Sequence, residues 1–195
     1  MDVKQGAAIL ILLLGSGAMS TVPANDLIID DRASGSLVSN LGSEWRMVTD
    51  QVMGGVSTGT LTLSAWKGRN CLRMQAAVST DNNGGFVQIV LSLSDQGTFD
   101  ASAYDGIELE VAGNNEHYNV HFRTSGLWLP WQSYRSGFAA TPEWQTVRIA
   151  FSDLKAYRTT RKFRKDKLER IGLVAIGRDF QADLYLASVR FYRTD

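Results

Sequence analysis

The chain has 195 residues, 44% of them hydrophobic and 21% charged, which suits one globular domain with a sizeable core. Twenty basic residues balance twenty acidic ones, so the net charge points to no class of partner and gives no sign of nucleic-acid binding. The single cysteine, Cys71, excludes an internal disulfide framework and a cysteine-based zinc site.

Residues 1–24 are predicted to be a secretory signal peptide. Lys4 precedes an apolar run over residues 7–14, and small residues follow up to Ser20. Eight apolar residues fall far short of the roughly 20 that a membrane-spanning helix needs. Basic, apolar and small segments in this order are typical of an export signal. We therefore expect an exported, periplasmic protein, with association with the inner membrane as a further option and an uncleaved anchor as the alternative.

Residues 25–195 are predicted to form a single all-β domain. Short apolar or alternating segments are divided by polar turns, and none shows a long helical period. Alternation is clearest over residues 107–111 and 118–122. About ten short antiparallel strands predict a two-sheet antiparallel sandwich of the jelly-roll kind. The expected strands are 27–29, 45–48, 56–63, 71–78, 86–93, 107–112, 118–122, 147–151, 171–176 and 184–192.

The stretch from Trp45 to Ser57 opens as a strand and then meets two consecutive glycines. Such a pair marks a backbone position with positive φ or a very close approach. Residues 55–59 also fit the Gly-x-Ser-x-Gly string of a hydrolase, which needs a helix after the serine. Residues 60–63 alternate like a strand instead, so we interpret Ser57 as part of a glycine-lined strand entry.

Several separated motifs occur in one order along the chain. They comprise Trp45, Asp50, Met53, Gly54, Gly55 and Ser57, then Gly84, Gly85 and Phe86, and later Trp144. Over residues 27–192 this pattern resembles the complex I intermediate-associated protein 30 family. The resemblance implies a galactose-binding-domain-like jelly roll in which these residues are a structural motif. It also implies a chaperone-like role in the assembly of respiratory complex I.

The segment from Asp81 to Gly85 looks like a fragment of a calcium loop, but it lacks the glutamate required at a later position. We interpret it first as a turn, and predict no metal or other cofactor. A structural calcium held by carbonyl and carboxylate oxygens is the alternative.

The region around residues 108–123 predicts a polar hairpin surface. His117 and His121 share one face of a strand but lie about 13 Å apart at ~3.3 Å per residue, too far to hold one metal ion. If the strands on either side of residues 113–115 pair, six polar side chains share one sheet face: Glu108, Glu110, His117, Asn119, His121 and Arg123. We favour a solvated face over a ligand-binding one.

An aromatic segment follows at a position where a loop is expected. Trp128, Trp131 and Tyr134 flank a proline, and Arg135 comes next. These side chains either stack on a sugar or anchor a protein partner, or they cap the open end of the sandwich. We favour capping, because large aromatic side chains are mostly buried.

Residues 155–170 carry eight basic side chains against two acidic ones. Such a run is either a solvated loop or a surface for anionic lipid or an acidic protein. The candidate binding residues within it are Arg161, Lys162, Arg164 and Lys165.

These observations favour a non-enzymatic binding protein. By the resemblance its partners are respiratory-complex subunits or the membrane surface. The alternative is an exported carbohydrate-binding module whose ligand is a carbohydrate. No coherent catalytic constellation emerges from the sequence, so no enzyme activity is predicted.

Overall fold

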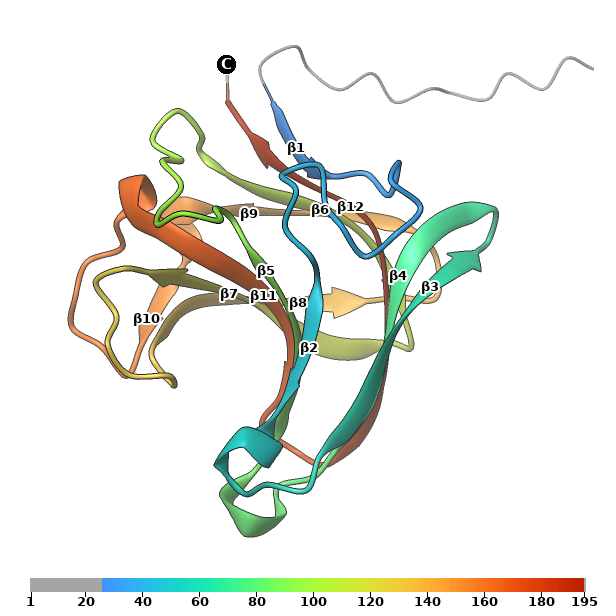
Figure 1. Ribbon diagram of the computed structural model, residues 1–195. Coiled ribbons are helices and arrows are strands. Elements are labelled where there is room, and N and C mark those ends of the chain that lie inside the picture. The colour runs from blue at the N-terminus through green and yellow to red at the C-terminus, as the bar shows by residue number, and fades with distance from the viewer. Residues whose placement is uncertain (1–25, 195) are drawn as a thin grey trace, which may run out of the picture.

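The computed structural model describes residues 26–194, so the predicted signal peptide lies outside the described residues. The described part of the chain is almost entirely β (Figure 1). Its strands are β1 (Leu27–Asp30), β2 (Arg46–Thr49), β3 (Thr58–Trp66), β4 (Arg69–Val78), β5 (Phe86–Ser92), β6 (Gly106–Gly113), β7 (Glu116–Thr124), β8 (Ser133–Ala140), β9 (Gln145–Ala150), β10 (Lys155–Tyr157), β11 (Leu168–Ile176) and β12 (Phe180–Tyr192). Four short 3₁₀ turns join them within this range: η1 (Asp50–Met53), η2 (Asp81–Asn83), η3 (Phe151–Asp153) and η4 (Lys165–Lys167).

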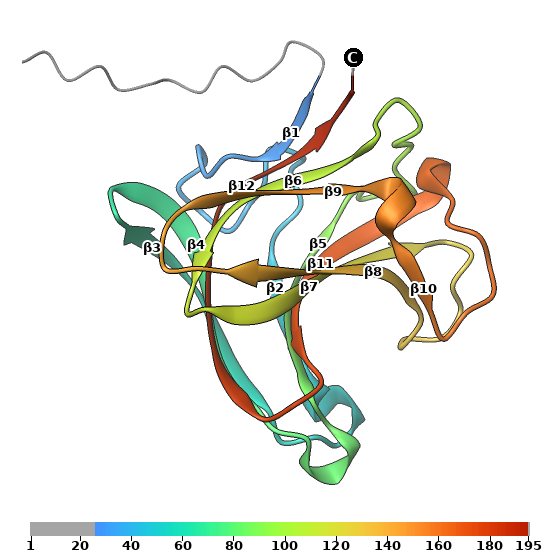
Figure 2. The same ribbon diagram turned by 180° about the vertical axis from the view of Figure 1, so that it is seen from behind.

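The strands form two six-stranded antiparallel sheets that pack face to face (Figure 1). One, the β12 sheet, has the order β3-β4-β12-β6-β9, with β1 also paired to β12. The other, the β7 sheet, has the order β10-β8-β7-β11-β5-β2. The predicted two-sheet antiparallel sandwich is therefore confirmed. Figure 2 shows β1 beside the last part of β12, and the backbone N–H of Arg193 donates to Asp26 at 3.0 Å.

The hydrophobic core lies between the two sheets and follows the alternation seen in the sequence. Val120 and Phe122 of β7 and Leu109 of β6 are fully buried from opposite sheets. The rings of Phe122 and Phe191 meet in the middle, with centroids 6.3 Å apart. Since one face of each sheet is used up in this core, function has to be sought on the outer faces and at the loops.

All ten expected strands are present, with ends shifted by a few residues, but two strands were missed. Residues 133–140 were expected to begin as a loop, yet they form β8. Gly137 and the small residues around it hide the alternation in which Tyr134, Phe138 and Ala140 face the core. β10 is only three residues long and pairs with β8.

The proposed pairing of the strands around residues 113–115 is wrong. β6 pairs with β12 and β9 in one sheet, whereas β7 pairs with β11 and β8 in the other. The chain crosses between the sheets at this turn, because β6 is already flanked on both edges. Glu108 and Glu110 therefore lie on the far side of the sandwich from His121 and Arg123.

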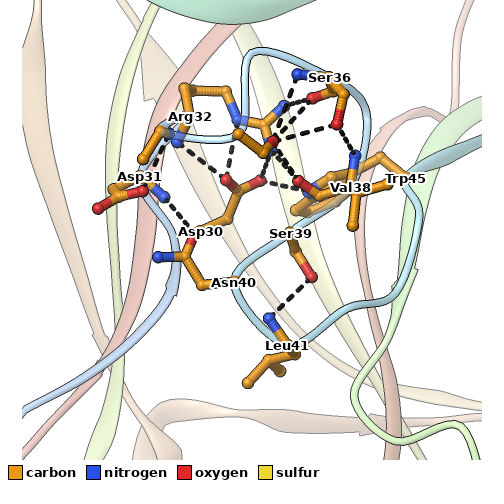
Figure 3. A network of polar contacts seen from close by, with 11 residues as sticks. Asp30, Asp31, Arg32, Ser36, Val38, Ser39, Asn40, Leu41 and Trp45 are labelled. Atoms are coloured by element: carbon orange, nitrogen blue, oxygen red, sulfur yellow. Dashed lines mark hydrogen bonds and ion pairs between the residues drawn. The ribbon is translucent and has the colours of Figure 1, made fainter.

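A buried polar network ties β1 to the strand that opens at Trp45 (Figure 3). Asp30 is almost fully buried and accepts from Trp45 Nε1 at 2.6 Å and from Arg32 Nε at 2.9 Å. Arg32 also donates from Nη1 to the carbonyl of Ser36 at 2.9 Å. Because the buried charges are paired and hydrogen-bonded, these interactions offset the free-energy cost of removing them from water. This network gives the family-motif residue Trp45 a structural role. Within the described residues, none of the helical turns has the length and hydropathy that a membrane-crossing helix needs.

Candidate binding cleft on the β7 sheet

A cleft of about 530 Å³ crosses the outer face of the β7 sheet. Its floor comes from β2, β5, β11, β7 and the first residue of β8. One wall is made by the η1 and η2 turns, and the other by residues 130–132 together with the end of β10. In Figure 1 this face lies between the η1 turn at the bottom and the yellow and orange loops at the left.

The floor is apolar at the end next to η1. Val48 of β2 and Val174 of β11 lie on either side of Gln88 in the sheet register. Phe86 lies opposite Ile176 one step further along. All five side chains line the cleft.

The floor is cationic at its other end. Arg170 of β11 lies directly opposite Arg123 of β7. Ser133 of β8 follows beside Arg123 and is paired with Tyr157 of β10. These four side chains also line the cleft, so it is polarised along the strands from an apolar end to a cationic end.

Between the two ends Gly172 opens the floor. It lies opposite Val90 on one side and His121 on the other. A Cβ at Gly172 would lie 3.0 Å from Gln88 Oε1 and 3.5 Å from Val90 Cγ1, which a small shift of the glutamine accommodates. A longer side chain at this position would project into the cleft.

The η1 wall is held by a buried carboxylate. Asp50 is fully buried and accepts from the backbone N–H of Ser57 at 3.0 Å, of Gly85 at 2.6 Å and of Phe86 at 3.2 Å. The hydroxyl of Ser57 donates to the same carboxylate. Burial raises the pKa of Asp50, but these hydrogen bonds outweigh it, so the net pKa lies below the ordinary value.

The glycines of the motif leave room for this carboxylate. A Cβ at Gly55 would lie 2.4 Å from Asp50 Cγ, and one at Gly84 would lie 2.6 Å from Asp50 Oδ2. Gly54 ends η1 with φ +89°, a conformation that favours glycine. The expectation that the Gly54-Gly55 pair needs positive φ and a close approach is confirmed, one requirement at each residue. Ser57 is a buried hydrogen-bonding residue followed by β3, as interpreted from the sequence.

The opposite wall is held by Arg123. Its guanidinium donates to the carbonyl oxygens of Leu127 at 3.0 Å, Leu129 at 2.8 Å, Pro130 at 3.1 Å and Gln132 at 2.7 Å. Gln132 in turn accepts from two backbone N–H groups of the same loop, each at 3.1 Å. The loop that presents Trp131 is thus fixed in place from the cleft floor.

The cationic end carries charge that no acidic group of the cleft offsets. Among the described residues that line the cleft there is no aspartate or glutamate. Burial lowers the pKa of Arg170, and the charges of Arg123 and Arg46 lower it further, against an opposing effect of Glu169. Burial likewise lowers the pKa of Arg123, again opposed by Glu169. Both groups stay protonated at neutral pH, because guanidinium begins so far above it.

Two polar atoms in the cleft floor have no hydrogen-bond partner within residues 26–194. They are Nε2 of His121 and the hydroxyl of Ser133, and both are buried. Burial, and to a lesser degree the charge of Arg135, lowers the pKa of His121 to about 4. The imidazole is therefore neutral at pH 7. Buried polar groups without a partner usually mark a site completed by something else.

The structure divides the predicted aromatic segment. Trp128 is 79% exposed and Trp131 46% exposed, and only Trp131 lines the cleft. Tyr134 is 2% exposed and donates to the carbonyls of Arg161 and Lys162, so it packs in the core and is not available to stack on a ligand. The burial that capping requires is found for Tyr134 and not for the two tryptophans. Arg135 lies on the same sheet face outside the cleft, 3.7 Å from the ring centroid of Tyr157.

The basic side chains of residues 155–170 are partly engaged. Arg161 stacks on Trp128 with 4.8 Å to the ring centroid, and Arg164 pairs with Asp166 at 2.7 Å. Lys165 donates from Nζ to a backbone carbonyl at 2.8 Å. Lys162 is exposed and lies in a shallow hollow beside the aromatic loop.

Trp144, the last residue of the family motif, lies on the outer face of the β12 sheet. Its Nε1 donates to the carbonyl of Trp66 at 3.1 Å, and it packs with Tyr185 and Cys71. Residues 81–83 form a 3₁₀ turn, as the turn interpretation expected. Over residues 26–194 no group of three or more histidine, cysteine, aspartate or glutamate side chains is arranged to hold a metal ion.

Arg170 and Tyr157 were expected only as part of the basic run over residues 155–170, and the η1 wall was not expected to form part of a site. A signal exists in β11, where Arg170, Gly172, Val174 and Ile176 alternate with core residues and change from charged to apolar. Met53 was expected as a structural residue of the family motif and Val52 had no expected role, yet Val52 is 72% exposed at the cleft wall.

The sequence comparison agrees with the buried carboxylate motif. The family model for complex I intermediate-associated protein 30 (CIA30) matches residues 38–186. The chain belongs to the CIA30 family. The match spans the Asp50 cradle, both cleft walls and most of the cleft floor. No curated protein matches this CIA30-family chain in sequence.

Solved structures show the same fold at low sequence identity. The family 11 carbohydrate-binding module of a cellulosomal cellulase from Clostridium thermocellum has a TM-score of 0.68 at 14% identity, covering 89% of this chain and 97% of that chain. The same module from that organism in complex with a β-1,3-1,4-mixed-linked tetrasaccharide has a TM-score of 0.66 at 13% identity, covering 87% and 96%. A family 30 module of another cellulase from that organism has a TM-score of 0.61 at 17% identity, covering 87% and 98%. The predicted galactose-binding-like jelly roll is thereby confirmed for this CIA30-family chain.

Proposed function

We propose that this protein is a non-catalytic, chaperone-like binding protein that holds an extended segment of a partner protein in the cleft of the β7 sheet. The observation that carries the proposal is the preformed cleft, whose walls are fixed by Asp50 on one side and Arg123 on the other. Because the groove is already ordered before a ligand binds, little of the binding free energy is lost to ordering it.

The chemistry of the cleft supports binding rather than catalysis. A serine nucleophile needs a hydrogen-bonded base, and His121 Nε2 and the Ser133 hydroxyl are each without a partner among the described residues. The imidazole also has a pKa of about 4, which is a poor match for a general base working near neutral pH.

The apolar rim supports a protein segment as the ligand. Val52 and Met53 project from the η1 wall, and Trp131 projects from the other wall. Exposed aliphatic, thioether and indole groups around one groove are typical of surfaces that accept apolar side chains of a partner. Membership of the CIA30 family supports a partner among the subunits of respiratory complex I.

Site-specific photocross-linking tests this proposal. A photoreactive amino acid replaces Val52 at the cleft wall in one variant and Leu63 in the other. Leu63 is a suitable control because it is 49% exposed and lies on β3 of the other sheet. We expect irradiated cells to yield a complex I subunit cross-linked through position 52 and not through position 63. Equal cross-linking from both positions, or none from position 52, would contradict the proposal.

A second candidate, an exported carbohydrate-binding module, is favoured by Trp131 and Tyr157, two aromatic side chains at one side of the cleft. Aromatic rings on such a face suit stacking on sugar rings. The fold shared with the carbohydrate-binding modules supports it as well. A glycan array separates the candidates: we expect a silent array, and a signal that disappears in Trp131→Ala would favour the carbohydrate.

We further propose that the protein is exported and lies next to the inner membrane. Support comes from the predicted signal peptide over residues 1–24 and from the basic run over residues 155–170. N-terminal sequencing of the cellular protein is expected to give a start between residues 19 and 25; an intact Met1 in the cytosol would contradict export. Binding to vesicles with anionic lipid is expected to weaken with salt and with the double change Arg161→Glu and Lys162→Glu.

A further inference from the structure

The cleft is chemically polarised, and this restricts the ligand more than its shape does. From Arg170 to Ile176 the cleft residues of β11 run over six residues, or roughly 20 Å at ~3.3 Å per residue. That length matches an extended peptide of about six residues. Along it the floor changes from two arginines to a set of aliphatic side chains and Phe86.

Of the two floor arginines, Arg170 is the one available to a ligand. Arg123 already donates to four backbone carbonyls of the aromatic loop. The guanidinium of Arg170 forms no hydrogen bond or ion pair with any described residue, although it is half-buried beside another cation. The nearest acidic group in its electrostatic surroundings, Glu169, does not line the cleft.

Two unpartnered hydrogen-bonding atoms lie on the same cleft floor, one and two strands away from Arg170. Ser133, which is 4% exposed, has a hydroxyl without a partner, and it flanks Arg123 on the next strand. His121 Nε2 is likewise unpartnered, one row further toward the apolar end. A half-buried guanidinium on a floor that also carries buried neutral polar groups suits a carboxylate, which accepts several hydrogen bonds at once.

We propose that the cleft binds a peptide segment with a defined direction, in which a carboxylate pairs with Arg170 and apolar side chains lie over Val48, Val174 and Met53. The carboxylate is an aspartate or glutamate side chain or a free C-terminus. Charge complementarity carries this choice, because the cleft offers cations and no described acidic side chain. The inference rests on the proposed function, since it specifies the segment that the partner supplies.

A peptide array tests the polarity. The array carries eight-residue peptides with four to five apolar residues, each made in matched pairs that differ only by aspartate or asparagine at one end. We expect the aspartate peptide to bind the folded protein at least tenfold more tightly at low salt. In Arg170→Met both members of a pair should bind equally, while Arg73→Met, which changes an arginine on the other sheet, should keep the preference.

A second pair of variants places the peptide. Gly172→Leu fills the cleft floor, whereas Gly137→Leu adds the same side chain on β8 of the same sheet face, outside the cleft. We expect Gly172→Leu to reduce peptide binding at least tenfold and Gly137→Leu to leave it within twofold. Circular dichroism on all variants shows that the fold is kept. If Gly172→Leu proves unfolded, the loss of the aspartate preference in Arg170→Met places the peptide in the cleft, and a preference kept in Arg170→Met overturns the inference.

The outcomes separate the two proposals. Peptides that bind in the cleft without preferring aspartate would overturn the acidic-segment inference and leave the proposed function in place. No peptide binding, together with saturable binding of decanoate or of an acidic oligosaccharide, would overturn both. Binding that survives Gly172→Leu unchanged in a folded variant would also overturn the inference, because the peptide would then lie elsewhere.

Discussion

The two sheets differ in how the arginines on their outer faces are paired. On the β12 sheet, arginines are paired with carboxylates: Arg73 with Asp183 at 2.8 Å, Arg69 with Glu110 at 2.9 Å, and Arg190 with Glu108. On the β7 sheet the cleft arginines are not ion-paired within the described residues. The guanidinium of Arg123 instead donates hydrogen bonds to backbone carbonyl oxygens.

The carboxylate beside the cleft is held by backbone groups, as the guanidinium of Arg123 is. Asp50 is held by backbone N–H groups and a hydroxyl, whereas Glu108 of the β12 sheet is held by Arg190 and Arg148. Backbone dipoles satisfy a charge without cancelling it. The β7 sheet therefore keeps net positive charge in its cleft, and the β12 sheet does not. This difference, rather than the overall charge of zero, indicates which face meets a ligand.

The largest expected effect is the loss of stability when the space around the buried Asp50 carboxylate is filled. Gly55→Val places side-chain atoms where Asp50 now lies, because even a Cβ would be 2.4 Å from Asp50 Cγ. We expect a loss of at least about 4 kcal/mol in the free energy of unfolding, or failure to fold. Ser57→Ala removes one donor and should cost about 1–3 kcal/mol. Urea unfolding measures both, and a Gly55→Val protein as stable as the parent would show that the cradle is not rigid.

The second effect concerns pH and the cleft floor. The pKa of His121 is lowered from 6.5 to about 4 in the folded state, so the unfolded state binds the proton first as pH falls. Stability is therefore fully present above pH 6.5 and is lost as pH falls toward 4, by at most about 3 kcal/mol. We expect His121→Gln to flatten the dependence of the unfolding free energy on pH between 7.5 and 4.5.

His117 supplies the control for that measurement, because it is exposed on the same strand. His117→Gln makes the same substitution on β7 outside the cleft. A parent protein whose stability is flat between pH 7.5 and 4.5 would mean that His121 finds a partner in solution.

The third effect tests the ion pairs of the β12 sheet. Glu108 is 6% exposed and is paired with Arg190, which is itself mostly buried. Glu108→Ala removes the nearer of the two carboxylates that pair with Arg190, leaving Asp26 at 3.5 Å, and should cost about 2–3 kcal/mol. Glu110→Ala, at a more exposed pair, should cost less than about 1 kcal/mol. Equal losses from the two changes would mean that burial of the pair does not matter here.

Features set by residues close together in the chain could be predicted from the sequence, whereas features set by residues far apart in the chain could not. Alternation in segments such as residues 107–111 and 118–122 reports the two faces of one strand, so the sandwich was predictable. Sheet partners were not, because the alternation of β6 says nothing of whether β7 or β9 lies beside it. The pair Gly54-Gly55 predicted a close approach to the backbone, but only the structure shows that the approaching group is Asp50. The cleft arises from strands distant in the chain, so no local pattern could outline it.

The smallest expected effect distinguishes the two faces most directly. Arg73→Met on the β12 sheet removes a partly exposed ion pair with Asp183 and should lower the unfolding free energy by up to about 1 kcal/mol. Arg170→Met on the β7 sheet removes a half-buried cation that has another cation opposite it, while the methionine keeps much of the apolar contact. Its effect should be zero or a stabilisation of up to about 1 kcal/mol, since burying an unpaired charge is costly. Urea unfolding at equal ionic strength compares the two variants. A destabilisation by Arg170→Met equal to that by Arg73→Met would mean that Arg170 has a structural partner, and that its charge is not held in reserve for a ligand.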